Sequence, residues 1–195
     1  MIVLDTETTG LDVGKNSLLS IGALELENPD NQFYGECRIF DGAVVHNQAL
    51  EVNGFSQVEA TDPEKPLPGE LLKSFFMWSE GCMEKDIAGH NVSFDTSFLL
   101  AEVARSDLKY PFSHRVVDTY SLAWIHMTQI GQEIPRKGGW SGIDSDFIFK
   151  YVGITEERGE HNALEDAKLT AEAISRLAYD KQLLGEYKKF SIPWK

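Results

Sequence analysis

The sequence predicts an α/β fold: a mixed β-sheet of three antiparallel N-terminal strands followed by parallel strands, flanked by α-helices. Residues 17–26 and 32–40 alternate apolar and polar side chains on either side of the turn-rich stretch ENPDN, which is typical of an antiparallel hairpin. Beyond residue 60, short apolar runs alternate with segments of helical periodicity. The resulting order β-β-β-α-β-α-β-α-α indicates one sheet covered by helices.

The individual elements are predicted from residues that interrupt regular structure and from the periodicity of apolar residues. Proline-rich stretches mark loops, apolar residues at three- and four-residue spacing mark helices, and Gly153 is suited to the residue after a helix end. The most regular pattern is the last helix, in which Ala163, Ala167, Ala171 and Ile174 share one face. The expected elements outside the hairpin are a buried strand at 1–5, a loop at 62–70, a helix at 71–81, a short strand in 85–91, a helix in 93–107, a short strand in 115–119, a helix in 120–130, a Gly-rich loop at 131–142, a helix in 144–154 and a long helix in 162–184.

Composition narrows the class of protein. The 195 residues suffice for one domain with a sizeable core, and the 42% hydrophobic and 25% charged fractions are ordinary for a soluble protein. We expect no membrane span and no secretory signal, because the chain has no long apolar run and no basic N-terminal leader. Cys37 and Cys82 form no C-x-x-C or Cys/His cluster, which disfavours structural zinc and disulfides and predicts a cytoplasmic location.

The formal charge of −13 argues against a protein that binds duplex nucleic acid over a wide surface, since such proteins are basic. It leaves room for a narrow site at which metal ions supply the positive charge.

The first unusual acids are Asp5 and Glu7, at the end of the first strand. Side chains two residues apart on a strand point the same way, so the two carboxylates converge. At ~4 Å and an effective dielectric constant of ~20, two like charges repel by roughly 4 kcal/mol. Such a pair needs a proton, a metal ion or wide separation, unless it is only a solvated strand end.

Two further acids lie at helix starts. Asp95 follows Asn91 and Ser93, either of which is a better N-cap, so Asp95 is free for another role or serves as a helix-dipole partner. His161 and Asp166 bracket the start of the last helix, and a lone histidine before a helix is often a solvated loop residue. Each of these positions has an ordinary structural explanation when taken alone.

Taken together, the three segments LDTETTGLD, GHNVSFDTSFL and EHNALEDA occur in order as D-x-E, H-N-x-x-F-D and H-x-A-x-x-D-A. In this pattern the sequence resembles the DEDD superfamily of 3′–5′ exonucleases, in its histidine-bearing DEDDh branch. A softer match is VVDTYSLAW at 116–124. The resemblance implies a ribonuclease H-like fold, with a single exonuclease domain at 1–180 and a short C-terminal tail at 181–195.

By this resemblance, the chain is a 3′–5′ exonuclease that releases nucleoside 5′-monophosphates from single-stranded 3′ ends, with DNA favoured and RNA open. Two divalent cations, Mg²⁺ or Mn²⁺, are implied, and oxygen-only ligands suit both ions. His161 is implied as the general base. A homodimer and a polymerase-type partner both stay open as assemblies. The implied metal ligands are Asp5, Glu7, Asp95 and Asp166.

The resemblance also implies substrate contacts at the first two motifs. For Phe94 a stacking face and a core position both stay open. The charged loop with Arg136, Lys137 and Trp140 is either a phosphate-and-base contact or an exposed turn. The implied contacts are Thr6, Thr8, Thr9, Gly10 and Leu11 for the terminal nucleotide, and His90, Asn91, Ser93 and Phe94 for the scissile phosphate.

Two other functions compete with this prediction. DTETT superficially resembles the D-x-D-x-T motif of haloacid-dehalogenase-type phosphatases, in which Asp5 would be the nucleophile, but Glu7 replaces the usual second aspartate. The late acids of this chain also lie inside a helix, where that family needs them at a strand end. A non-catalytic nucleic-acid-binding module would be favoured by a missing ligand or base, and all five are present.

Overall fold

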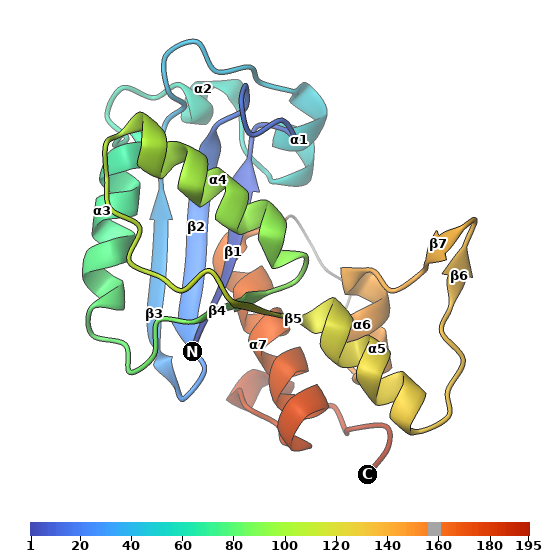
Figure 1. Cartoon of the computed structure of the whole chain (residues 1–195). Helices are drawn as coiled ribbons and strands as arrows, with labels where there is room; N and C mark the ends of the chain where they lie inside the picture. The colour runs from blue at the N-terminus through green and yellow to red at the C-terminus, as the bar shows by residue number, and fades with distance from the viewer. Residues whose placement is uncertain (156–160) are drawn as a thin grey trace.

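The computed structural model describes residues 1–155 and 161–195, which surround a five-stranded sheet (Figure 1). In the sheet order β3-β2-β1-β4-β5, the first three strands pair antiparallel, and β4 and β5 add parallel to β1. This confirms the mixed sheet predicted from the sequence. The strands are β1 (Ile2–Thr8), β2 (Leu18–Glu25), β3 (Asn28–Glu36), β4 (Ile87–Gly89) and β5 (Val116–Asp118).

The hairpin between β2 and β3 differs from the prediction in its turn. Glu25 already pairs with Asn28, after a register shift between Leu24 and Glu25, so most of ENPDN belongs to β3 and the predicted turn is wrong. The strand also ends at Glu36, before the predicted residue 40. Proline has no backbone N–H to donate, and β3 tolerates Pro29 because it is an edge strand. The polar residues of this segment stay largely solvated.

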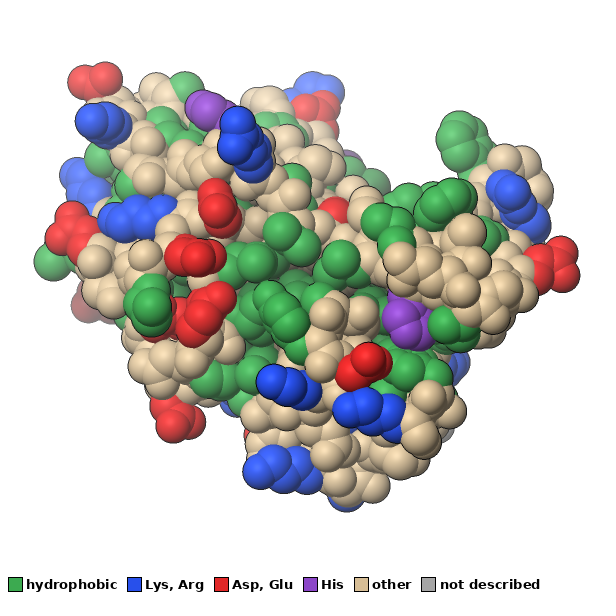
Figure 2. Space-filling model, turned by 60° about the horizontal axis from the view of Figure 1, so that its bottom comes forward, with side chains coloured by type: hydrophobic (Ala, Val, Ile, Leu, Met, Phe, Trp, Pro, Cys, Tyr) green, Lys and Arg blue, Asp and Glu red, His purple; other side chains and the backbone are tan. Residues whose placement is uncertain are grey.

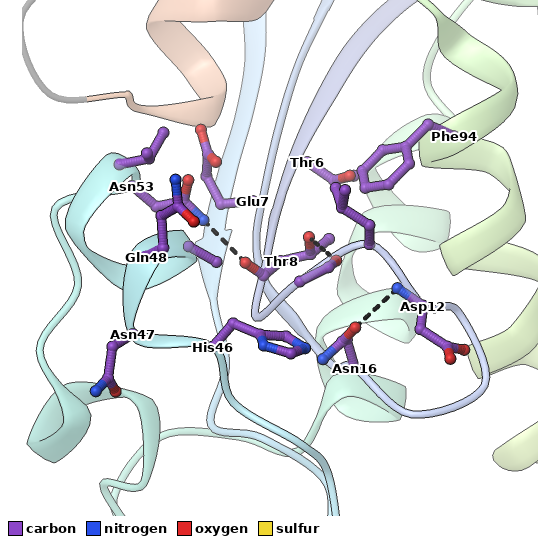
Figure 3. A pocket seen from close by; sticks show the side chains of 14 residues that line it. Thr6, Glu7, Thr8, Asp12, Asn16, His46, Asn47, Gln48, Asn53 and Phe94 are labelled. Atoms are coloured by element: carbon purple, nitrogen blue, oxygen red, sulfur yellow. Dashed lines mark hydrogen bonds between the residues drawn. The ribbon is translucent and has the colours of Figure 1, made fainter.

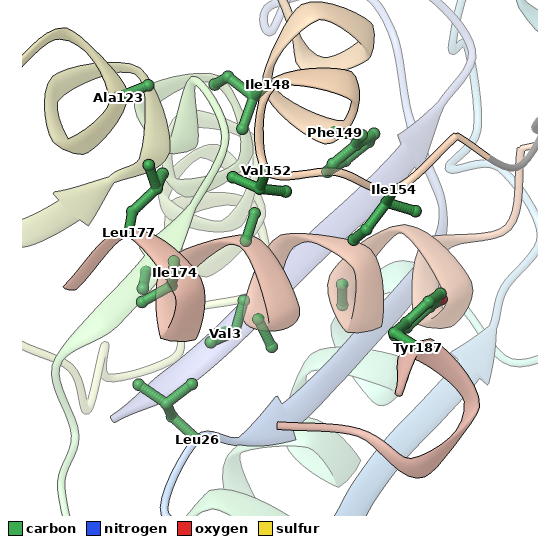
Figure 4. Packing of buried hydrophobic residues seen from close by; sticks show 14 of the residues in the cluster. Val3, Leu26, Ala123, Ile148, Phe149, Val152, Ile154, Ile174, Leu177 and Tyr187 are labelled. Atoms are coloured by element: carbon green, nitrogen blue, oxygen red, sulfur yellow. The ribbon is translucent and has the colours of Figure 1, made fainter. Parts of the chain in front are cut away.

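Helices cover both faces of the sheet, and β1 contributes to both cores. Ile2 and Leu4 pack on the side of α3 (Pro68–Ser79) and α4 (Val92–Arg105). Val3 points the other way, into the cluster with α7 (Ala163–Tyr179), α5 (Thr119–Gln129) and α6 (Ser145–Tyr151), as Figure 4 shows. Strand alternation therefore directs Asp5 and Glu7 toward the α7 side.

Helix α7 ends earlier than predicted and carries the C-terminal segment. It stops at Tyr179, because Asp180 takes the left-handed conformation with φ 54°, and the predicted extension to 184 is wrong. Arg176 and Glu172 form a fully buried ion pair, with 2.7 Å between Nε and Oε1. The Nη2 group of Arg176 also donates to the carbonyl of Tyr187, so the last residues are packed onto α7.

Several elements lie where the sequence pattern predicted none or placed their ends elsewhere. Helices α1 (Asn47–Val52) and α2 (Gln57–Ala60) were not expected, and the expected Gly-rich loop contains a hairpin of β6 (Arg136–Lys137) and β7 (Trp140–Ser141). Helix α3 begins three residues before the predicted 71, because Pro68 takes the first helical position, where a missing N–H costs nothing.

Across residues 1–155 and 161–195, no helix is both long and apolar enough to cross a bilayer. Cys37 and Cys82 are both buried and both free.

Candidate active site

The five acids and bases singled out from the sequence lie together at the carboxyl end of β1. They line a cavity of about 250 Å³ that also has Thr6, His90, Asn91 and residues of α6 in its walls. The site is therefore assembled from four parts of the chain: β1, the start of α4, the loop that leads into α7, and the first turn of α7. The shared lining residues are Asp5, Glu7, Asp95, His161 and Asp166.

A glycine in β2 lets α7 reach this cavity. Gly22 pairs with Asp5 across the sheet, and a Cβ atom on Gly22 would lie 2.1 Å from the backbone C of Ala163 and the backbone N of Leu164. The first turn of α7 therefore rests directly on the strand beside Asp5. Asn162 caps this turn, since its Oδ1 accepts the N–H of Leu164 at 3.1 Å.

One side of the cavity brings Glu7, His161 and Asp166 together. One ligand atom from each residue lies within 4.8 Å of the others, which is a spacing that can hold a metal ion. Nδ1 of His161 is 3.1 Å from Oδ2 of Asp166. The backbone N–H of His161 donates to the carbonyl of Val52 at the end of α1, at 3.2 Å, so α1 helps to fix the histidine.

Asp95 comes from the opposite face of the sheet. Its Oδ1 accepts hydrogen bonds from the backbone N–H of Thr6, at 2.9 Å, and from the Thr6 hydroxyl, at 2.7 Å. Burial nonetheless raises the pKa of Asp95 to about 7, because desolvation outweighs these two donors. Burial therefore favours the protonated form of Asp95, and a cation bound nearby would favour the carboxylate.

The donor set fits divalent cations. Glu7, Asp95 and Asp166 are each at most 6% exposed, and Asp5 is half-buried beside them. Among the described residues that line this cavity, none is a lysine or an arginine. Carboxylate oxygens gathered without a basic side chain match the ligand preference of Mg²⁺ and Mn²⁺.

A second cavity, of about 700 Å³, adjoins the first (Figure 3). Thr6, Glu7 and Phe94 line both cavities, so the larger one opens directly onto the acids. Its volume is in the range of small-molecule sites and can accommodate a nucleotide. Phe94 is half-buried, with its ring 5.0 Å from that of Phe98 and also exposed to the cavities.

One wall of this larger cavity is formed by α1 with the residue before it. Nδ2 of Asn53 donates to the carbonyl of Thr8 at 2.9 Å, which ties the end of α1 to the end of β1 (Figure 3). Gly10 has φ +155°, and a Cβ there would lie 2.4 Å from Cδ2 of His46, so only glycine allows this close approach.

The structure separates the predicted substrate contacts into two groups. Most line a cavity, but Thr9 and Ser93 do not. Thr9 is fully buried and its hydroxyl donates to the carbonyl of Val44, so it holds the loop. Ser93 is exposed, on the outer side of the first turn of α4. The predicted contacts that do line a cavity are Thr6, Thr8, Gly10, Leu11, His90, Asn91 and Phe94.

The sequence pattern missed the contribution of α1 and α6. Residues 41–61 showed neither a strand nor a helix pattern, yet His46, Asn47, Gln48 and Asn53 line the larger cavity. Nothing in the sequence alone marks these residues, because α1 has six residues and buries only one side chain. The loop residues Arg136, Lys137 and Trp140 line neither cavity.

Comparison with known proteins gives one family. The model of the exonuclease family RNase_T matches residues 2–174. Ribonuclease T of Photobacterium profundum is 28% identical over 212 residues, which covers 97% of this chain and 86% of the relative. Ribonuclease T of Cronobacter sakazakii is 29% identical over 188 residues, which covers 87% of this chain and 77% of the relative.

Solved structures share the fold. The nuclease domain of 3′hExo, a DEDDh family member bound to rAMP, superimposes with a TM-score of 0.71 at 16% identity, over 94% of this chain and 93% of that one. E. coli Exonuclease I in complex with a dA16 oligonucleotide gives a TM-score of 0.69 at 17% identity, over 93% of this chain. The chain spans 41% of the length of Exonuclease I. These likenesses confirm the ribonuclease H-like fold.

Proposed function

The chain belongs to the RNase T exonuclease family, and from this premise we propose that it removes nucleoside 5′-monophosphates from the 3′ end of single-stranded nucleic acid. The observation that carries this proposal is the group of four carboxylates in a cavity without lysine or arginine among its described lining residues, next to a nucleotide-sized cavity. The two cavities share Glu7, so a nucleotide in the larger one brings its phosphate to the acids.

We propose that Asp5, Glu7, Asp95 and Asp166 hold two divalent cations, Mg²⁺ or Mn²⁺. When bound, such ions supply electrostatic stabilisation of the attacking and leaving oxygens at phosphorus. The hydrogen bonds from Thr6 keep Asp95 oriented toward the cavity.

His161 is suited to accept the proton of the attacking water. Its side chain is 37% exposed, and its Nδ1 lies 3.1 Å from Oδ2 of Asp166. In this role the neutral imidazole accepts the proton from water, and the carboxylate of Asp166 stabilises the imidazolium that forms. The competing role for this histidine is that of a metal ligand, because it lies within ligand distance of Glu7 and Asp166.

The substrate we propose is single-stranded, with DNA favoured and RNA open. The solved relatives include Exonuclease I with dA16 and with dT13, and 3′hExo with rAMP. The larger cavity takes the terminal nucleotide, with Thr8, Gly10 and Leu11 on one side and α1 on the other. A homodimer, a polymerase-type partner and a cytoplasmic location stay predictions from the sequence.

The phosphatase alternative is not favoured by the family match. It also requires a lysine beside the nucleophile, and the described lining of the acidic cavity has none. The non-catalytic alternative is not favoured by the same match to an exonuclease family.

The direct test follows hydrolysis of a single-stranded oligonucleotide labelled at its 5′ end or at its 3′ end. With Mg²⁺, the 5′-labelled strand should shorten one nucleotide at a time, and the 3′ label should appear at once in a nucleoside 5′-monophosphate. EDTA and Asp5→Asn should each abolish both products. Release of inorganic phosphate alone from a strand labelled as its 5′-phosphate, with no shortening of the strand, or full activity of Asp5→Asn, would contradict the proposal.

A separate variant tests the role of His161. If the histidine is the base, His161→Ala lowers the hydrolysis rate by about 10²–10⁴-fold and leaves Mn²⁺ affinity nearly unchanged. A parallel loss of Mn²⁺ affinity would assign it to the metal ligands instead.

A further inference from the structure

The β6–β7 hairpin is a small, well-defined projection. Gly138, with φ +61°, and Gly139 form the turn, and Lys137 pairs directly with Trp140 across the two strands. Residues directly opposite each other in an antiparallel pair extend to the same face with closely spaced Cβ atoms. The ammonium group of Lys137 and the indole of Trp140 are therefore neighbours on one face, while Arg136 extends to the other.

The three side chains contribute little to the fold. Trp140 is 81% exposed, and Arg136 and Lys137 are exposed as well. In residues 1–155 and 161–195, none of the three side chains forms an ion pair, a side-chain hydrogen bond or a ring contact. Exposure of one apolar side chain is ordinary for a protein surface. An aromatic face beside two cations is the combination that binds single-stranded nucleic acid.

The charge of the hairpin differs from that of the chain. Residues 134–143 contain two cations and no acid, in a protein with a formal charge of −13. The acids that flank this stretch are Glu133, Asp144 and Asp146, and Asp144 is occupied in capping α6 through the N–H of Phe147. Figure 2 shows hydrophobic and basic side chains exposed on the projection at the right of the molecule, with acidic ones beside them.

The position of the hairpin links it to the active site. It leads directly into α6, and Ser145 and Phe149 of α6 line the acidic cavity. The hairpin extends from the body of the molecule on the side of α5 and α6 (Figure 1). A nucleic-acid strand whose 3′ nucleotide lies in the cavities has to continue out of the site toward its 5′ end. The hairpin, which carries two cations and a tryptophan, lies next to the wall that α6 forms.

We infer that the β6–β7 hairpin binds the single-stranded substrate on the 5′ side of its terminal nucleotide. Trp140 stacks on a base, which is sequence-tolerant because every base offers a π-face, and Lys137 and Arg136 bind backbone phosphates. The inference rests on the proposed function, and it adds a second contact outside the cavities. It predicts that the chain prefers strands long enough to reach the hairpin.

The test compares a dinucleotide with an oligothymidylate of about twelve nucleotides, a length within known single-strand site sizes. Trp140→Ala should raise KM for the longer strand by about 5- to 100-fold, as expected for one lost stacked base, with kcat and the rate on the dinucleotide unchanged. Arg136→Gln combined with Lys137→Gln should reduce the slope of log KM against log salt by about 1.4, since each phosphate contact on a single strand contributes about 0.7.

Matched controls use side chains outside the hairpin. Met83→Ala removes an apolar side chain that is 82% exposed, and Lys181→Gln with Lys188→Gln removes two exposed cations. These variants should keep the wild-type length dependence and salt slope.

Equal KM values for wild type and Trp140→Ala on the longer strand would overturn the inference. A change from dimer to monomer in Trp140→Ala, without any effect that depends on substrate length, would overturn it in favour of an interface between two copies. If the wild-type protein hydrolyses neither substrate, the proposed function fails by itself. Fluorescence anisotropy of the labelled oligothymidylate in EDTA then tests the hairpin independently, with weaker binding by Trp140→Ala as the supporting result and unchanged binding as the contrary one.

Discussion

Replacement of Gly22 by alanine should separate α7 from the sheet at the active site. Gly22 is the β2 partner of Asp5, and α7 begins directly above it. The added Cβ would lie 2.1 Å from backbone atoms of Ala163 and Leu164, whereas ordinary contact begins at 3.4 Å. These backbone atoms cannot rotate away as a side chain can, so the start of α7 has to move by about 1.3 Å, which is the difference between these two distances.

Such a shift carries Asp166 away from Asp5 and Glu7, because Asp166 lies in the first turn of α7. A misplacement of about 1 Å in a catalytic group costs on the order of 100-fold in rate. Overpacking of a filled site also lowers the free energy of unfolding by about 1–3 kcal/mol. We therefore expect Gly22→Ala to fold, with reduced stability and an exonuclease rate about 100-fold below wild type.

The assay measures the rate of oligonucleotide hydrolysis at saturating Mg²⁺, together with urea unfolding. Gly35→Ala is the matched control, since Gly35 is also a sheet glycine and its Cβ would lie 2.4 Å from Cδ1 of Leu71. That atom is the end of a flexible side chain on the α3 side, so this variant should share a stability loss but keep its rate. A folded Gly22→Ala protein with the wild-type rate would refute the reasoning that this close approach positions Asp166.

Three further predictions concern single side chains. Thr6→Val removes the hydroxyl that donates a hydrogen bond to Asp95. A hydrogen bond to a charged group contributes about 1.5–3 kcal/mol, so its loss should raise the Mg²⁺ concentration for half-maximal hydrolysis by about 10- to 100-fold. An unchanged Mg²⁺ requirement would contradict this prediction. Arg176→Leu leaves the buried carboxylate of Glu172 without its cation and should lower the free energy of unfolding, measured in urea, by about 3–5 kcal/mol. A loss below about 1 kcal/mol would contradict this prediction. The hydrogen bond from Asn31, together with one from a backbone N–H, holds the pKa of Glu25 below its usual 4.5. The ionised Glu25 therefore stabilises the fold fully above pH 4.5, and this stabilisation is lost as the pH falls through the lower pKa of the folded state. The difference in urea midpoint between wild type and Glu25→Gln should shrink as the pH falls through this range, and a difference that stays constant would contradict the prediction.

The sequence predicts the strands, the main helices and the grouping of the acids, because these depend on local periodicity and on motif order. Asp5 and Glu7 share a face through strand alternation alone, and the structure places Asp95 and Asp166 in the same cavity. Two of the predicted substrate contacts, Thr9 and Ser93, line neither cavity. Thr9 is turned inward for a tertiary reason, a hydrogen bond to Val44, which is 35 positions away.

Other parts of the site were not predictable from local patterns. Helix α1 is too short to show a periodicity. It contributes to the site through Asn53, which donates a hydrogen bond to the carbonyl of Thr8, and Val52, whose carbonyl accepts one from the backbone N–H of His161. The role of Gly22 is hidden as well, since a glycine in a strand gives no sign of which backbone approaches it. Each of these features depends on residues distant in sequence.

The central claim is that carboxylates from β1, α4 and α7 form one metal-dependent catalytic centre. The most direct measurement compares Mg²⁺-dependent shortening of a 5′-labelled single strand by wild type, Asp95→Asn and Asp166→Asn, each checked for folding by circular dichroism. We predict that both variants fold and that each loses at least about 100-fold in rate, although the helices that carry the two aspartates cover opposite faces of the sheet. A folded variant of either kind that keeps the wild-type rate would contradict the claim.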